Sequence, residues 1–154
     1  MQSDYHNLPR INGYSQHDGK TYKARVVSHK SGLLTLDISG AYPAEAQIQQ
    51  WLRTIKVQKG KQVEITEDFA LQSYLAPTQL MLITPIEPQL TTAGLITLGS
   101  HTMNYNAKQL TPEVEDLTPL LDPTLKQMWG PHLYRIKMTI CSQKLKQRIQ
   151  YVIR

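Results

Sequence analysis

The sequence predicts an all-β fold, an antiparallel β-sandwich of about nine to eleven short strands. Segments rich in β-branched and aromatic residues alternate apolar and polar side chains, as strands with one buried face do. Turn-forming residues recur about every eight to twelve positions, and no segment has the spacing of a long amphipathic helix. Because the connections are too short for crossover helices, the strands should pair antiparallel.

The composition fits one folded domain spanning residues 1–154. Hydrophobic residues make up 40% of the chain, yet no apolar run approaches the about 20 residues that cross a membrane as a helix. A net charge of +5 favours a polyanionic partner, such as an acidic polysaccharide or a nucleic acid. Cys141 is the single cysteine, which excludes a disulfide within the chain. The first ten residues lack the basic and apolar stretches of a secretory signal.

Residues 5–19 are dense in turn formers and predict a shaped loop. Pro9 fixes the backbone, and the pairs Asn12-Gly13 and Asp18-Gly19 suit type I′ turns. Loops positioned by a rigid sheet are where binding residues gather, so this segment should lie at an end of the sandwich that faces a partner domain. The polar and aromatic groups held there are Tyr5, His6, Asn7, Arg10, Asn12 and His17.

The next strands should form a hairpin from residues 21–28 and 33–39, joined by a turn that ends in Gly32. The second of these segments places Leu34, Leu36 and Ile38 on one face. Residues 43–50 could form one helical turn that starts at Pro43, because proline is tolerated at the first position of a helix.

The strongest prediction is a hairpin of residues 51–57 and 63–71. If Val57 lies opposite Val63, the same register pairs Trp51 with Phe69, and the apolar side chains of both strands share one face. The register also places Arg53 opposite Glu67 on that face. Because a half-buried charge is costly unless it is paired, these two residues should form a structural ion pair.

Five further segments complete the predicted sandwich. Residues 79–86 are almost continuously apolar, which suits a strand covered on both faces. Residues 94–98 and 102–107 should form a hairpin, and two more strands should cover residues 133–142 and 148–154.

The sequence carries no complete catalytic or metal-binding motif. The five histidines are scattered without ligand spacing, and no glycine-rich phosphate loop, nucleophile elbow or carboxylate pair is present. No metal site is therefore predicted within this chain. Basic residues alternate with tyrosines in residues 22–25 and 134–137, which leaves a nucleic-acid-binding face as a weaker alternative, since no recognition helix or stacking motif accompanies it.

Four segments in order resemble the C-terminal β-sandwich region of heparinase II/III-like polysaccharide lyases: YHNLPRINGYSQHDG, LDISGAYP, WLRTIKVQKGKQVEITEDF and WGPHLYRIKMTI. Lyases of this family eliminate across the bond at C4 of a uronic acid, and the polysaccharide lies between an N-terminal helical toroid and the β-region. The resemblance implies a periplasmic or extracellular protein that acts on glycosaminoglycan-type substrates. It also implies a helical toroid as the partner domain, while nucleic acid and membrane are not expected partners.

The resemblance makes His6 and Asn7 the catalytic candidates, because they match a His-Asn pair near the cleft of the family fold. A histidine can move a proton near neutral pH, and an asparagine can donate to a carboxylate or an enolate. Tyr5, Arg10, Asn12 and His17 are the candidates for substrate binding. No cofactor is expected in this chain, although the full-length family fold can hold a divalent metal near the cleft. The helical-domain catalytic residues have no counterpart here, so the isolated chain should be inactive.

One alternative function fits the same residues. The chain would then be a non-catalytic carbohydrate-binding or structural β-sandwich module, in keeping with the missing catalytic set.

Overall fold

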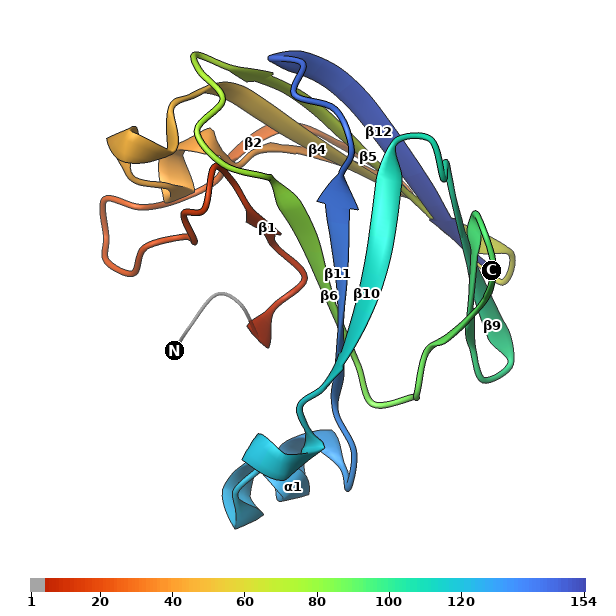
Figure 1. Cartoon of the computed structure of the whole chain (residues 1–154). Coiled ribbons are helices and arrows are strands. Elements are labelled where there is room, and N and C mark those ends of the chain that lie inside the picture. Colours follow the sequence, from red (N-terminus) through yellow and green to blue (C-terminus); the bar gives the residue numbers. More distant parts are fainter. Residues whose placement is uncertain (1–4) are drawn as a thin grey trace.

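The computed structural model describes residues 5–154 and shows two antiparallel sheets packed face to face (Figure 1). The predicted all-β sandwich is confirmed, with twelve strands among the described residues in place of about nine to eleven. The small sheet has the order β1 (Pro9–Arg10), β6 (Gln79–Thr84), β11 (Tyr134–Ile140) and β10 (Leu110–Asp116). The large sheet has the order β2 (Arg25–Lys30), β3 (Leu33–Asp37), β4 (Ile48–Gln58), β5 (Gln62–Leu71), β12 (Lys146–Ile153), β9 (His101–Tyr105), β8 (Leu95–Leu98) and β7 (Gln89–Thr92).

The central hairpin of β4 and β5 has the predicted register. Trp51 lies opposite Phe69 and Arg53 opposite Glu67, and their side chains are buried between the two sheets. The Trp51 and Phe69 rings stack with centroids 4.3 Å apart and an angle of 6° between their planes. Regular alternation over the whole hairpin explains this agreement, because any slip by one residue would turn an apolar row towards water.

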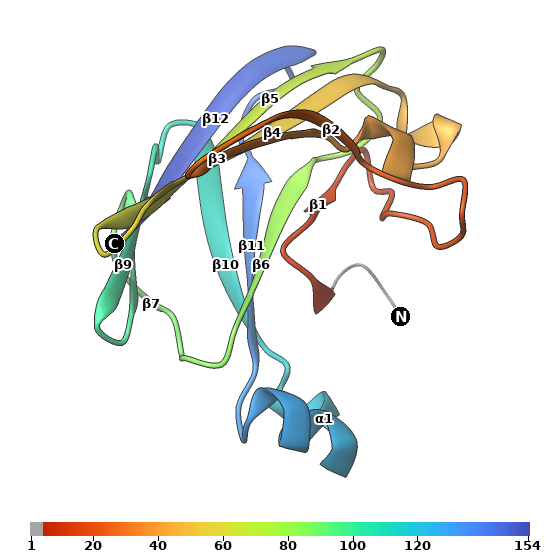
Figure 2. The ribbon, with the colours of Figure 1, turned by 180° about the vertical axis from the view of Figure 1, so that it is seen from behind.

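The small sheet supplies the other side of the core. Leu80, Ile136 and Met138 from β6 and β11 are all less than 2% exposed and belong to the same hydrophobic cluster as Trp51. In Figure 2 the large sheet curves over β6, β11 and β10, so the two layers enclose this cluster. Residues 5–8 and the helix α1 (Pro123–Trp129) lie at the open end of the small sheet.

Several element boundaries differ from the sequence prediction. The first long strand begins at Arg25, and residues 44–46 form a short 3₁₀ turn preceded by Pro43, which takes an extended conformation. The strands β7 and β10 and the helix α1 were not predicted. β10 contains Pro112, which usually argues against a strand, but β10 lies at the edge of its sheet, where a missing backbone N–H is tolerated.

The strand β2 forms one edge of the large sheet. Val26 and Val27 are 61% and 46% exposed, and the pairing with β3 is interrupted by a bulge between Val26 and Ser28. The same strand carries Arg25, His29 and Lys30, all of them exposed. Cationic side chains and a bulge are two features by which natural proteins protect an edge strand.

Within residues 5–154, no helix has the length and apolar character needed to cross a membrane.

Candidate functional site

The predicted site residues fall into separate groups along the N-terminal segment. Tyr5, His6 and Asn7 lie before β1, at the end of the small sheet that also carries α1. Arg10 is the last residue of β1, and Asn12 lies in the turn that follows. His17 is exposed in the loop before β2, where its ring lies 5.0 Å from that of Tyr22. The structure therefore brings together Tyr5, His6 and Asn7, which include both catalytic candidates.

Asn7 is exposed, but its side chain and its backbone are both anchored. Its Oδ1 accepts a hydrogen bond of 2.7 Å from the backbone N–H of Ile83 in β6. Its backbone carbonyl accepts a 2.5 Å hydrogen bond from Nη1 of Arg53. Because the amide oxygen is used by the protein, the Asn7 Nδ2 group is the part of the side chain left to donate to a ligand.

Arg53 joins this segment to a buried charge cluster of Trp51, Arg53, Glu67 and Tyr151. The Glu67 carboxylate is 0% exposed and accepts hydrogen bonds from Arg53 Nε at 2.7 Å and from Trp51 Nε1 at 2.6 Å. The buried Tyr151 hydroxyl also interacts with this carboxylate. Both charges are thus compensated and hydrogen-bonded, which a buried ion pair requires to be tolerated. The predicted ion pair is confirmed.

The cluster has a fixed protonation state. Burial alone would lower the pKa of Arg53, but the attraction of the Glu67 carboxylate outweighs it and raises that pKa above its ordinary value. Burial raises the pKa of the Tyr151 hydroxyl, and the negative charge of Glu67 raises it further. Arg53 therefore stays charged and Tyr151 stays neutral across the physiological pH range, so neither group serves as a proton shuttle.

His6 and Tyr5 line an apolar pocket of about 340 Å³ beside α1. The other residues that line it are Leu117, Leu120, Leu121, Leu125, Met128, Trp129 and Leu133. The Tyr5 ring also lies under the Arg135 guanidinium, 5.6 Å from its centroid, and Arg135 is paired with Glu115 at 2.8 Å. The His6 imidazole is therefore half-buried against hydrophobic side chains.

The sequence reasoning missed this pocket because it missed α1. Local signals for the helix were present: Asp122 caps its N-terminus by accepting from the backbone N–H of Leu125 at 2.8 Å, Pro123 is its first residue, and Gly130 ends it. The helix has only seven residues, too few for an amphipathic period to be recognised.

Asn12 has a structural position. It is 3% exposed, and with Gly13 it forms the predicted turn, both residues having positive φ angles of 51° and 86°. Its Nδ2 donates to the carbonyls of Ala46 and Ser73, both at 2.9 Å, and its Oδ1 accepts from Leu75 N–H at 3.0 Å. Its side chain is therefore used to hold three loops together, and this geometry gives no support to a role in substrate binding. Arg10 is exposed, and its Nε donates to the Gly13 carbonyl at 3.1 Å.

Replacing Asn12 with alanine should lower the free energy of unfolding by about 2 kcal/mol, because the backbone groups of Ala46, Ser73 and Leu75 lose their partner. Urea unfolding of the variant measures this, with Arg10→Ala as the control. Arg10 is exposed, so its replacement should cost less than about 0.5 kcal/mol. Equal effects of the two substitutions would contradict the structural assignment of Asn12.

The described residues do not provide a metal site. Among residues 5–154, no three His, Cys, Asp or Glu side chains are grouped so that they could hold a metal ion. His6 faces apolar side chains in its pocket. The divalent metal implied by the family resemblance therefore does not fit the residues around His6.

No protein-family model and no curated protein matches this sequence. Among solved structures, the chain is similar to a mutant of the heparan sulfate lyase HepC from Pedobacter heparinus, with a TM-score of 0.66 and 12% sequence identity. The likeness is one of fold. It extends over 99% of this chain but only 24% of the lyase, so the chain spans about a quarter of the length of that enzyme.

Proposed function

We propose that this chain is the β-sandwich region of a heparinase II/III-like lyase of acidic polysaccharide, and that it forms one wall of the substrate cleft. The observation that carries the proposal is the likeness of almost the whole sandwich to part of a heparan sulfate lyase. The net charge of +5 supports it, because a basic surface attracts an acidic polysaccharide.

In this proposal Tyr5, His6 and Asn7 face the substrate. The Asn7 Nδ2 group would donate to a uronate carboxylate, since its Oδ1 is held by Ile83. The His6 imidazole would accept or return a proton, a role that histidine side chains can fill near neutral pH. Neutralising the carboxylate and moving the C5 proton need further groups, which a preceding domain would supply.

We propose that this preceding domain is a helical toroid and that it covers the apolar pocket beside α1. Leu120 and Met128 are 61% and 74% exposed, and Trp129 is 40% exposed. Large exposed apolar side chains around one pocket are typical of a surface that another domain buries. Such an arrangement would place His6 at the junction of the two domains. As part of such a lyase, the protein would work in the periplasm or outside the cell.

The incomplete catalytic set favours a second candidate function. A carbohydrate-binding module needs no proton-transfer groups, and a sandwich of this size can bind a polysaccharide on its own. The two functions differ in whether His6 contributes to binding.

A titration of the isolated chain with a heparan sulfate oligosaccharide tests the proposed function. We expect NMR shifts of the backbone amides of residues 5–7, with weak affinity that falls further from low to physiological salt, because half of the cleft is absent and the attraction is screened. No unsaturated uronate should form. His6→Ala should remove the shifts around residue 6, whereas His101→Ala, in the exposed part of β9, should leave them unchanged.

Shifts that avoid residues 5–7 entirely would refute the cleft assignment and favour the binding-module function. Formation of unsaturated uronate by the isolated chain would show that a complete active site exists within it, also against the proposal.

A further inference from the structure

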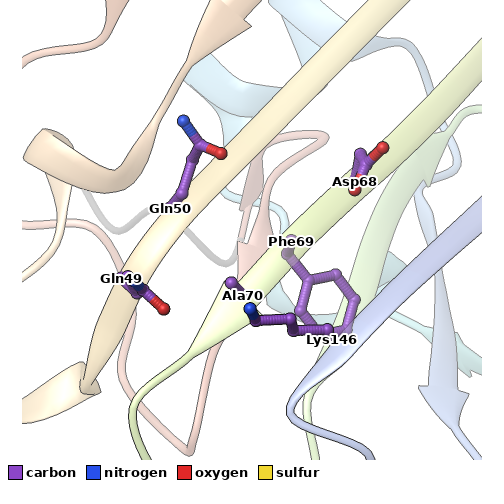
Figure 3. A pocket seen from close by; sticks show the side chains of 6 residues that line it. All are labelled: Gln49, Gln50, Asp68, Phe69, Ala70 and Lys146. Carbon is purple, nitrogen blue, oxygen red and sulfur yellow. The ribbon is translucent and has the colours of Figure 1, made fainter.

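The outer face of the large sheet carries two neighbouring polar hollows. The first has a volume of about 380 Å³ and is lined by Gln49, Gln50, Asp68, Phe69, Ala70 and Lys146 (Figure 3). The second has about 420 Å³ and is lined by residues 31–33, Thr54, Lys56, Val57, Glu64, Thr66 and Arg148. Each volume lies within the about 300–1,000 Å³ typical of small-ligand sites.

The strand register joins the two hollows. Asp68 of the first lies directly opposite Arg148 of the second in the pairing of β5 with β12, and Lys146 lies opposite Ala70 two residues along. In the pairing of β4 with β5, a bulge between Ile48 and Gln50 adds Gln49 beside Gln50 at the rim of the first hollow. The two hollows thus lie side by side across β4, β5 and β12, and together they are called here the sheet-face groove.

Five charged side chains line the sheet-face groove. They are Lys56, Glu64, Asp68, Lys146 and Arg148. Within residues 5–154, none of them makes a side-chain hydrogen bond or ion pair, although Lys56 is directly opposite Glu64 and Arg148 is directly opposite Asp68. Their donors and acceptors are therefore available to a ligand, as are the amides of Gln49 and Gln50.

The lining of the groove indicates the chemistry of its ligand. Three cations against two carboxylates favour an anion, while the carboxylates and amides suit hydroxyl groups, which donate as well as accept. The only aromatic residue in the lining is Phe69, which is 3% exposed, so no ring is offered for stacking a base or a neutral sugar. An acidic oligosaccharide has both anionic groups and hydroxyls along an extended chain.

We propose that the sheet-face groove is a binding site for an acidic oligosaccharide, separate from the N-terminal segment. Lys146 and Arg148 bind sulfate or carboxylate groups, and Asp68 accepts hydrogen bonds from sugar hydroxyls. The site shares its ligand class with the proposed function but none of its residues, so each can fail without the other. Such a site holds the polysaccharide to the protein away from the cleft.

Binding of a heparin-derived hexasaccharide to the full chain tests whether Lys146 and Arg148 bind the anionic groups of the ligand. Replacing both cations, Lys146→Gln with Arg148→Gln, should raise the Kd at least about tenfold, the loss expected for a charge-assisted contact. The control removes the same charge at Lys108 and Lys126, which line neither hollow, and should change the Kd less than about threefold. Calorimetry measures both, and NMR shifts should fall on β5 and β12.

Asp68→Ala gives the sharper test, because two models predict opposite signs. If the face attracted the ligand by net charge alone, removing a carboxylate would tighten binding. If Asp68 binds hydroxyls, the Kd should rise about fivefold or more, although the loss of the carboxylate makes the net charge more positive. Asp68 is exposed and its side chain makes no hydrogen bond or ion pair within residues 5–154, so the variant should fold normally, which a thermal melt checks.

Three results of the affinity measurements would overturn the proposal. They are equal losses of affinity in the Lys146 and Arg148 double variant and in its control, tighter binding by Asp68→Ala, and binding of a single-stranded oligonucleotide at least as tight as that of the hexasaccharide. Shifts confined to residues 5–7 would also overturn it while supporting the cleft function.

Discussion

Replacing Arg53 with alanine should lower the free energy of unfolding by about 3–5 kcal/mol, because Glu67 would remain buried with an uncompensated charge. Arg53 is 7% exposed, and three of its contacts, two to Glu67 and one to the Asn7 carbonyl, would be lost together. Urea unfolding followed by circular dichroism measures the change. Loss of the Asn7 contact should also loosen the segment that carries His6.

Two comparisons make the Arg53 result specific. Arg25→Ala removes an arginine whose side chain is 73% exposed in its pair with Asp37, and it should cost less than about 1 kcal/mol. The double variant Arg53→Met with Glu67→Leu removes both buried charges and should recover much of the lost stability. A double variant that is less stable than Arg53→Ala would show that packing around the cluster, and not the unpaired carboxylate, sets the cost.

Replacing Trp51 with alanine should lower the free energy of unfolding by about 3–5 kcal/mol, since it opens a cavity at the centre of the core. Trp51 is 0% exposed and stacks on Phe69, and its Nε1 donates to Glu67. Trp51→Phe separates these contributions. It keeps an aromatic ring, loses only part of the side-chain volume, and removes the Nε1 hydrogen-bond donor. Its expected cost is about 1.5–3 kcal/mol, the range for a hydrogen bond to a charged group.

Equilibrium unfolding of both Trp51 variants checks this prediction, with Trp129→Phe as the matched control. Trp129 is 40% exposed beside the apolar pocket, so its replacement should change stability by less than about 0.5 kcal/mol. If Trp51→Phe were as stable as the unmodified protein, the hydrogen bond to Glu67 would make no net contribution to the free energy of unfolding.

The central hairpin could be predicted to the residue because its information is local. Each side chain in β4 and β5 chooses a face by alternation, and pairing Val57 with Val63 fixes all other partners, including Arg53 with Glu67. β10 was missed because Pro112 and its three acidic residues argue against a strand. Ion pairs with the neighbouring β11 explain why two of the acidic residues are tolerated in the strand, because Glu115 pairs with Arg135 and Glu113 pairs with Lys137.

The site was harder to predict because its geometry depends on contacts far apart in the chain. Asn12 and His6 look equally available in the sequence, but only the packing of residues 46, 73 and 75 around Asn12 commits its amide to the interior. The sheet-face groove likewise combines β4, β5 and β12, and the β5–β12 pairing that places Asp68 opposite Arg148 had not been predicted. Residue types alone do not predict which strands will pair and bring these side chains together.

The protected edge at β2 has a consequence for copies of this chain in solution. A free strand edge with two exposed valines offers backbone groups on which a second molecule could continue the sheet. Arg25, His29 and Lys30 bring like charges together when two such edges approach, and the bulge breaks the regular ladder that a partner would need. Mutual repulsion at this edge therefore opposes growth of the sheet from one molecule into the next, and raising the salt concentration weakens that safeguard.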